Sequence, residues 1–530
     1  MQLFTKKLFL PILCCVLILV CQSNISFAQT TYKDVVPVLI ANCNTCHHTG
    51  SIGFPLTTYS EVVPMGAAIK SAVLTKHMPP WPADPTYKNY VHERVLSPAD
   101  ITLLVDWIDN GMLAGDTTLA PPLPVYSNTQ LNGTPDLILN LPKFISTATN
   151  ADHYYCMNVP TGLLQDRYIR AFEFVPGNKP LIHHAVITID TTGNAIDDFS
   201  GNCFNQQGQI GIGDYAPGMG PTVLPGVVPA KFGFKLKAGS KMSFQIHVPE
   251  GTAGLQDSSQ LRIYFYPVNE PNVRDMYFQT VLQNWNFFIP ANDSVVVTQK
   301  YPPTVAGLPI NVSLYGAFPH SHKTCTAILN FAYNNTDTIP LIRINHWDFH
   351  WQMQYTFKKM VKVPNNYHLF SVHKFDNTVN NPETPDHNAP VIPGTNTYDE
   401  MFFDSYLFAY YLPGDENINI DSLLQNDPLF FPSSTNDLDK TIHNIKVYPN
   451  PFDEWIQLDY HLLNAQYVTV SILNSLGQEI NQISSSIESS GLHSHRWDGK
   501  NQQGLKMPSG VYIYKIQAGN KLMTGKVFLK

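Results

Sequence analysis

The middle of the chain, from residue 136 to about 425, consists of short β-branched and aromatic runs separated by Gly, Pro and Asn turns. Such runs predict β-strands, because branched and aromatic side chains pack well on a pleated surface and Gly or Pro ends the strand. Short strands at this spacing are typical of β-sandwiches, and about 290 residues suffice for two of them. The clearest predicted strands are 168–175, 181–189, 241–248 and 261–267.

Residues 30–115 have a helical pattern instead. Ser97 and Pro98 match the N-cap and first turn of a helix, and apolar residues then recur at helical spacing. An earlier apolar patch contains Pro37, which a helix tolerates in its first turn, so Asp34 is the expected N-cap there. This part is therefore predicted to be a small α-helical domain.

The first 28 residues have the pattern of a secretory signal peptide. Lys6 and Lys7 precede the apolar run 8–20, and small residues allow cleavage after Ala28. The run is short for a membrane span, and a lipoprotein site at Cys21 is an alternative. No later segment is predicted to cross a membrane, and a net charge of -8 without a Lys/Arg run argues against a nucleic-acid partner.

Cys43-Asn44-Thr45-Cys46-His47 has the spacing C-x-x-C-H. Two thiols at this spacing can bond to the vinyl groups of a haem, and the following histidine then reaches the iron. A redox dithiol or half of a zinc site would also fit, but no second closely spaced cysteine pair completes a zinc site. The motif predicts one covalently attached haem c.

The stretch 76–81 contains His77, Met78 and two prolines. It resembles the cytochrome c family, in which a methionine beside prolines commonly closes the haem site. The resemblance implies that Met78 is the second axial ligand, with His77 as the alternative. His/Met ligation raises the reduction potential and suits electron transfer. His48 is expected to be a surface or packing residue.

Histidine clusters and one methionine stand in the predicted β region: His183 and His184, His247, His320 and His322, and Met401. On a strand, His320 and His322 would point to one face and could share a metal. His183 and His184 would point to opposite faces unless the backbone bends between them. Imidazole suits copper, zinc or iron, whereas a thioether selects a soft ion such as Cu(I).

The order of these clusters resembles the copper type II, ascorbate-dependent monooxygenases, which include peptidylglycine hydroxylating and dopamine β-monooxygenase enzymes. Members have adjacent histidines, then Gln-x-His, His-x-His and Asp-Glu-Met, as this chain has between residues 136 and 425. The resemblance implies two jelly-roll-like β-sandwich domains, each with one copper, facing each other across a solvent-filled cleft. It also implies hydroxylation of a C–H bond of a small-molecule substrate with O2 and two electrons.

The resemblance assigns the ligands as well. It implies that His183, His184 and His247 hold the copper that supplies electrons. The copper that binds oxygen and acts on the substrate is implied to be held by the catalytic set His320, His322 and Met401.

The chain departs from the amidating members of the family at four positions. Phe318 stands where those enzymes have an arginine that grips a carboxylate, and Phe403 and Ser405 replace a polar Asn and Tyr. Phe402 replaces a cysteine beside the methionine. A peptide C-terminus is therefore not the expected substrate.

Other residues near these clusters are expected to have no role in binding metal. The resemblance implies a disulfide between Cys156 and Cys203, which leaves Cys325 as a buried free thiol. The aromatic neighbours of His346 and His350 favour a packed strand, and neither is assigned a metal.

The last 85 residues or so form a further predicted β unit, with Gly-punctuated strands. The stretches 447–452, 509–516 and 525–528 resemble the type A sorting domain of the Bacteroidetes type IX secretion system. The resemblance implies the type IX machinery as a partner and a secreted or cell-surface location reached through the periplasm. A carbohydrate-binding or fibronectin-like accessory module is the alternative.

Together these patterns predict a secreted copper-dependent monooxygenase whose electrons come through the haem, with ascorbate or another external donor as an alternative source. A non-catalytic surface electron-transfer or copper-binding protein is the main alternative function, and an adhesin is a third. The predicted order is signal peptide 1–28, cytochrome c-like domain 29–116, linker 117–135, copper domains 136–272 and 273–425, linker 426–444 and sorting domain 445–530.

Overall fold

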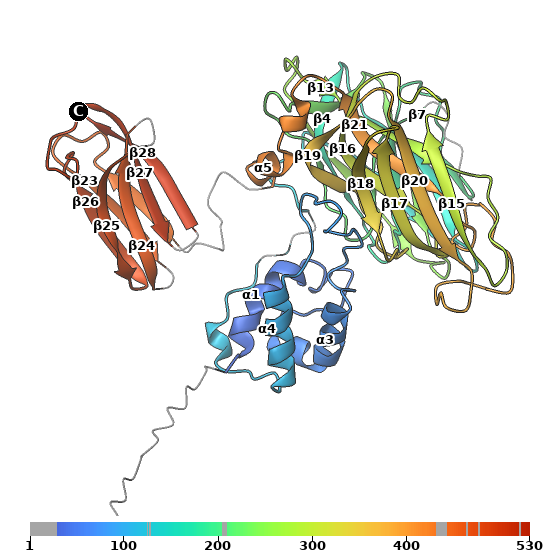
Figure 1. The fold of residues 1–530 in the computed structure, drawn as a ribbon, viewed down its shortest axis with the longest axis horizontal. Helices are drawn as coiled ribbons and strands as arrows, with labels where there is room; N and C mark the ends of the chain where they lie inside the picture. Colours follow the sequence, from blue (N-terminus) through green and yellow to red (C-terminus); the bar gives the residue numbers. More distant parts are fainter. Residues whose placement is uncertain are drawn as a thin grey trace, which may run out of the picture. The chain divides into compact units, whose positions relative to one another are not determined.

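The computed structural model describes residues 29–124, 126, 129–203, 209–430, 442–462, 465–474, 478–518 and 521–530. The chain divides into two compact units after residue 431. Most of the described residues that have regular structure lie in β-sheets and a smaller part in helices, which confirms the predicted multidomain β-rich fold class (Figure 1). The predicted signal peptide lies outside the described residues. No helix among those described is long and apolar enough to span a bilayer.

The N-terminal part is a small group of helices around a buried core that contains Leu104 and Trp107. Ser97 caps the last α-helix as predicted, since its hydroxyl accepts a hydrogen bond from the amide of Asp100 at 3.1 Å. The first helix begins three residues earlier than predicted, because Thr31 is its N-cap. Pro37 consequently lies inside that helix. The helices are α1 (Tyr32–Asn42), α2 (Tyr59–Val62), η1 (Val63–Met65), α3 (Gly66–Leu74), α4 (Pro98–Asp109) and η2 (Thr117–Leu119).

The first β-sandwich joins a six-stranded sheet to a five-stranded sheet. The six-stranded sheet contains β1 (Leu137–Asn140), β12 (Gln260–Phe265), β4 (Arg167–Val175), β9 (Phe232–Leu236), β13 (Arg274–Asp275) and β8 (Thr222–Val223). The five-stranded sheet contains β6 (Asp198–Gly201), β3 (His153–Pro160), β10 (Lys241–Val248), β5 (His184–Asp190) and β7 (Gln209–Tyr215). A short pair, β2 (Phe144–Ile145) and β11 (Gln256–Asp257), lies beside them. Alternate aromatic residues such as Phe172 and Phe244 form the core between the sheets.

The second β-sandwich has two four-stranded sheets. One contains β14 (Tyr277–Gln283), β21 (Phe403–Tyr410), β16 (Val312–His320) and β19 (Tyr355–Val363). The other contains β15 (Ser294–Tyr301), β20 (His368–Asp376), β17 (Cys325–Tyr333) and β18 (Thr338–Ile344). After the last strand come η3 (Asp415–Asn417) and α5 (Ile420–Gln425). Leu314 and Phe357 lie in its buried core.

The segment 81–94, between α3 and α4, leaves the helical part and packs on the second sandwich. Tyr90 is fully buried there, and its hydroxyl donates to the carbonyl of Leu341 at 2.7 Å. The amide of Val91 donates to the carbonyl of Thr356 at 2.8 Å. Backbone and side-chain hydrogen bonds therefore join the helical part to the β core. The predicted domain boundary at residue 116 does not account for this, because segment 81–94 lies inside the predicted helical domain but packs on the second sandwich.

Residues 426–430 also belong to the β core, so the predicted linker 426–444 begins too early. The carboxylate of Asp427, 4% exposed, forms an ion pair with Arg170 on β4. Leu429 packs against the core of the first sandwich. A nearly buried ion pair holds this stretch in place, and nothing in the local sequence pattern reveals its partner.

Replacing Asp427 with alanine is expected to lower the free energy of unfolding by about 3 kcal/mol, because the Arg170 guanidinium loses its buried counter-charge. Urea unfolding followed by tryptophan fluorescence would measure the change. Asp166→Ala is the matched control, since its ion pair with Lys235 is half exposed and worth at most about 1 kcal/mol. Equal effects of the two changes would contradict this account of the Asp427 contact.

The C-terminal unit is a smaller β-sandwich, as the sequence predicted. Its fully buried residues include Trp497, Tyr460 and Ile516. A three-stranded sheet contains β22 (Ile442–Tyr448), β23 (Ile456–Leu462) and β26 (Gly491–Trp497). The four-stranded sheet contains β25 (Glu479–Glu488), β24 (Gln466–Leu473), β27 (Gly510–Ala518) and β28 (Lys521–Leu529).

Candidate metal centres

Three histidines of the first sandwich converge on one point. His247 on β10 lies directly opposite His184 at the start of β5. His183 precedes β5 in a bend, and its amide donates to the carbonyl of His247 at 3.1 Å. Because the chain bends at His183, the two adjacent histidines do not point to opposite faces. One candidate ligand atom from each ring lies within 4.8 Å of the others.

The ring nitrogens of this histidine triad face one another. Nδ1 of His184 lies 3.3 Å from Nδ1 of His183 and 3.1 Å from Nδ1 of His247. Burial lowers the pKa of His183 and His184 well below its usual value. Both rings are therefore neutral at pH 7. Nitrogen lone pairs turned toward one another in this way fit a shared metal cation.

Asp152 holds the far side of the His247 ring. Its carboxylate lies 3.3 Å from Nε2 of His247 and accepts the amides of Glu250 and Thr397 at 3.0 and 3.1 Å. The ring of Tyr154 stacks on His247 with centroids 4.5 Å apart. Nε2 makes no hydrogen bond among the described residues, but the carboxylate at 3.3 Å favours a proton on Nε2, which leaves the lone pair of Nδ1 for a metal.

Replacing Asp152 with asparagine is expected to weaken copper binding by the triad about tenfold, because the orientation and basicity of His247 are lost. Competition titration with a Cu(I) chelator would measure the affinity. Asp197→Asn is the control, since that exposed carboxylate accepts hydrogen bonds from Asn158 on the same sandwich, away from the triad. Unchanged affinity in Asp152→Asn would rule out this role for the carboxylate.

His320, His322 and Met401 meet in the second sandwich. β16 ends at His320, and His322 lies in the loop beyond it, so the prediction that a strand presents both rings on one face is wrong. Their rings nevertheless lie 5.3 Å apart between centroids. Sδ of Met401 lies 3.3 Å from Nε2 of His320. The turn at the strand end, rather than the period of the strand, brings the two imidazoles together.

Nδ1 of each of these two imidazoles forms a hydrogen bond to an oxygen. Nδ1 of His320 donates to the amide oxygen of Gln352 at 2.6 Å, and Nδ1 of His322 donates to the carbonyl of Asp399 at 3.1 Å. The lone pairs are therefore on Nε2. Burial lowers the pKa of His320 to about 4 and that of His322 to about 3. Two neutral imidazoles and a thioether are a donor set that suits Cu(I).

Glu400, next to Met401, fixes the loop that carries the methionine. Its buried carboxylate accepts the amides of His322, Thr324 and Met401 at 2.5, 3.1 and 2.7 Å. Burial raises the pKa of this carboxyl to about 7, although the hydrogen bonds act in the opposite direction. Glu400 thus ties the His320–His322 loop to the methionine, a role that the sequence did not predict.

The two groups of donors are neighbours. The rings of His184 and His320 lie 6.2 Å apart between centroids. Phe349 stacks on His183 at 4.9 Å and meets His322 edge-on at 5.6 Å. The resemblance implied a solvent-filled cleft between the coppers, but here the half-buried rings of His184 and His320 come close. They do so because the loop before β21 is hydrogen-bonded to the first sandwich through the Asp152 carboxylate.

The C-x-x-C-H motif borders a cavity of about 920 Å³. Cys43, Cys46 and His47 line it together with Met78 and many apolar side chains. Nδ1 of His47 lies 2.9 Å from the carbonyl of Phe54, which can only accept, so the lone pair is on Nε2. Two free thiols, an oriented imidazole and a half-buried methionine around one cavity fit a haem c. His77, the alternative ligand, lines the cavity but is exposed.

Part of the wall of this candidate haem cavity comes from the β core: His183, Pro217, His350 and Trp351. His183 thus belongs both to this wall and to the histidine triad. His350 lies in a turn in which Asp348 accepts from its amide at 2.9 Å, so the packed strand predicted around His346 and His350 is wrong.

The remaining cysteines lie away from this cavity. Cys156 and Cys203 form a disulfide, with Cα atoms 5.8 Å apart. Cys325 is a buried free thiol, and burial raises its pKa well above its usual value. His48 stacks on Tyr126, with ring centroids 4.3 Å apart, and is a packing residue as expected.

Comparison with known proteins matches one family model, the FlgD Ig-like domain, at residues 457–521 of the C-terminal unit. No curated protein matches the sequence. Among solved structures, PorZ of Porphyromonas gingivalis, described as a surface component of the type IX secretion system, is 18% identical, covers 23% of this chain and has a TM-score of 0.14. Dimeric latent PorU of the same organism is 10% identical, covers 72% and has a TM-score of 0.15.

The β-glucuronidase of Ruminococcus gnavus is 9% identical, covers 50% of this chain and has a TM-score of 0.12. The chain spans 14%, 34% and 47% of the lengths of PorZ, PorU and this β-glucuronidase. TM-scores this low do not establish a shared fold. The family comparison therefore shows similarity to an Ig-like domain, at residues 457–521.

Proposed function

We propose that the chain is a copper-dependent monooxygenase that receives its electrons through a covalently attached haem c. The observation that carries the proposal is the double position of His183. This residue lines the cavity of the C-x-x-C-H motif and also belongs to the triad of converging imidazoles. If a haem occupies that cavity, one residue of the cavity wall, His183, is also a candidate copper ligand.

The donor sets support a division of roles. His183, His184 and His247 offer three nitrogens for a copper that passes electrons, whereas His320, His322 and Met401 offer the softer set. Copper at these sites would supply the oxygen chemistry that hydroxylates a C–H bond, and the haem would supply single electrons. The protein orients the ligands through Asp152, Gln352 and the Asp399 carbonyl.

The surroundings of Met401 favour an uncharged substrate with an apolar part. Phe403 stacks near His320, with ring centroids 6.1 Å apart, and the half-exposed Trp285 lies edge-on to Phe403 at 4.9 Å. Phe318 stands on the same strand as His320, two residues earlier. These aromatic side chains offer contact area and no positive charge that would bind a carboxylate.

A second candidate function is electron transfer or copper binding without hydroxylation. The observation that favours it is the 6.2 Å separation of the His184 and His320 rings. Metal sites this close exchange electrons readily and leave little room between them for a substrate.

Metal analysis and stopped-flow spectroscopy separate the two functions. Two coppers and one haem per chain, with ferrous haem oxidised when oxygen and substrate are added, are expected for the monooxygenase. Copper-depleted protein is the control and should keep its haem reduced for much longer. Haem oxidation without substrate-dependent oxygen uptake would favour electron transfer. A chain that binds no copper would leave only a binding scaffold.

We also propose that the C-terminal unit directs secretion by the type IX system, on the basis of its opening and closing motifs and its separation as a compact unit. In a host with this system, a chain that ends at residue 444 should accumulate in the periplasm, whereas the full chain should reach the surface or medium. Export of the shortened chain at the normal level would disprove the assignment.

A further inference from the structure

Arg94 has an unusual position in the haem cavity. Among the described residues that line this cavity, it is the one Arg or Lys, and no Asp or Glu is present. Its Nη2 donates to the carbonyl of Gly218. Its Nη1 is buried and has no hydrogen-bond partner in the described part of the chain. A buried guanidinium nitrogen without an acceptor among the described residues can still accept a partner from outside the polypeptide, either a water molecule or a bound group.

Arg94 touches three parts of the molecule. Its backbone belongs to segment 81–94, which is bonded to the second sandwich. Its Nη2 holds the loop that follows β7 in the first sandwich, and the cavity belongs largely to the helical part. Gly218 has a φ of +81°, and a Cβ there would come 3.4 Å from Nη1 of Arg94 and 3.6 Å from Trp351. These distances are ordinary van der Waals contacts, so the positive φ, rather than the space, is the reason for a glycine at this position.

A haem would bring two carboxylates into this largely apolar cavity. Guanidinium is the side-chain group best matched to a carboxylate, because its N–H groups form a fixed fork. We propose that Nη1 of Arg94 binds a haem carboxylate while Nη2 stays on Gly218, so that haem attachment ties the helical part to the β core beside His183. This inference rests on the proposed haem.

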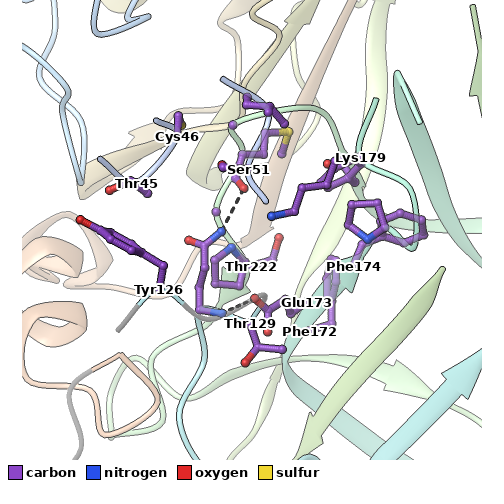
Figure 2. A pocket seen from close by; sticks show the side chains of 18 of the residues that line it. Thr45, Cys46, Ser51, Tyr126, Thr129, Phe172, Glu173, Phe174, Lys179 and Thr222 are labelled. Atoms are coloured by element: carbon purple, nitrogen blue, oxygen red, sulfur yellow. Dashed lines mark hydrogen bonds between the residues drawn. The ribbon is translucent and has the colours of Figure 1, made fainter. Parts of the chain in front are cut away.

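A second cation lies nearby and provides a control. Lys179 extends into a neighbouring polar cavity of about 390 Å³, which Thr45, Cys46 and Arg94 also line (Figure 2). Burial raises the pKa of the Cys46 thiol, and the charges of Arg94 and Lys179 act in the opposite direction. Both cations are thus close to the motif, but Lys179 does not line the haem cavity.

Spectroelectrochemical titration of the haem from pH 5 to 9 tests the proposal, with the full chain and the variants Arg94→Gln, Arg94→Lys and Lys179→Gln. Loss of the guanidinium charge favours ferric haem. Arg94→Gln should therefore lower the ferrous-to-ferric ratio at a fixed potential about tenfold, which is 59 mV for one electron. It should also make the midpoint potential depend on pH, because the carboxylate loses its partner and titrates in this range.

Arg94→Lys should restore most of both properties, and Lys179→Gln should cause a smaller shift with no new pH dependence.

Hydrogen exchange gives an independent readout of the tie to the β core. The amides of residues 218–220 should exchange more slowly in the haem-loaded protein than in the haem-free Cys43→Ala/Cys46→Ala chain. Haem-loaded Arg94→Gln should exchange as fast as the haem-free chain. An unchanged midpoint and unchanged exchange in Arg94→Gln, or equal effects of Lys179→Gln, would overturn the role of Arg94. Absence of covalent haem from the unaltered chain would instead overturn the proposed function itself.

Discussion

Replacement of Met401 by alanine is expected to reduce substrate-dependent oxygen uptake at least about a hundredfold while most of the bound copper remains. The change removes the sulfur 3.3 Å from Nε2 of His320. The imidazoles of His320 and His322 stay in place, because Gln352 and the Asp399 carbonyl still bind their other nitrogens. Loss of a metal ligand exceeds the ten- to hundredfold effect typical of residues that only orient ligands. An oxygen electrode and metal analysis of the same sample would measure both quantities.

Met401 is also 5% exposed and buried in packing contacts, so alanine would cost stability as well as a ligand. Met401→Leu separates the two effects, because leucine keeps the volume and lacks the sulfur. Met360→Leu is the matched control, since Met360 on β19 is also a buried methionine and lies outside both candidate sites. The ligand assignment fails if Met401→Leu retains the oxygen uptake of Met360→Leu.

Replacement of both Cys43 and Cys46 by alanine is expected to abolish covalent haem and to stop electron delivery to copper from reductants that act through the haem. The copper content should stay the same, because the triad and the methionine site lie on the β-sandwiches. The absorption of denatured protein after removal of free haem would measure covalent attachment. Oxygen uptake with a haem-specific electron donor is expected to fall at least about tenfold, the loss of an essential relay.

Cys325→Ala is the control for this pair of changes, because Cys325 is a buried free thiol outside the haem cavity. It should keep both haem and oxygen uptake. If the double variant still uses electrons from the same donor at the normal rate, the haem does not serve the copper sites. In that case ascorbate or another external donor becomes the source.

The features that the sequence predicted well are those with local causes. The cap at Ser97 depends on residues three positions apart, and the structure has the predicted bond. The strands β4 and β10 follow from alternating or continuous apolar runs, and their bounds lie within one residue of the predicted ones. The histidines and the methionine of the candidate sites were grouped by the resemblance, and the structure brings the members of each group together. The bend that makes His183 usable was stated as a condition and is present.

The features that the sequence missed depend on distant partners. Asp152 and Thr397 are bonded although 245 positions separate them, and Arg170 pairs with Asp427 across 257 positions. Neither pair has a local signal. The two-residue period of a strand predicted that His320 and His322 lie together. They do, but because of the turn after His320, since β16 ends at that residue. Pro37 is the opposite case. The local rule restricts proline to the first turn of a helix, but α1 begins at Tyr32 and has Pro37 in its interior.

By itself, the sequence determined which side chains are present for chemistry and which local elements carry them. Spacing in a motif, cap residues and apolar periodicity act over a few positions, so they can be read along the chain. Only the tertiary structure decided that His183 stands in the wall of the candidate haem cavity, that Arg94 lines this cavity and has a buried nitrogen without an acceptor among the described residues, and that the two groups of imidazoles are neighbours. These arrangements result from packing between surfaces far apart in the chain, and the free energy of burial that selects them has no local pattern.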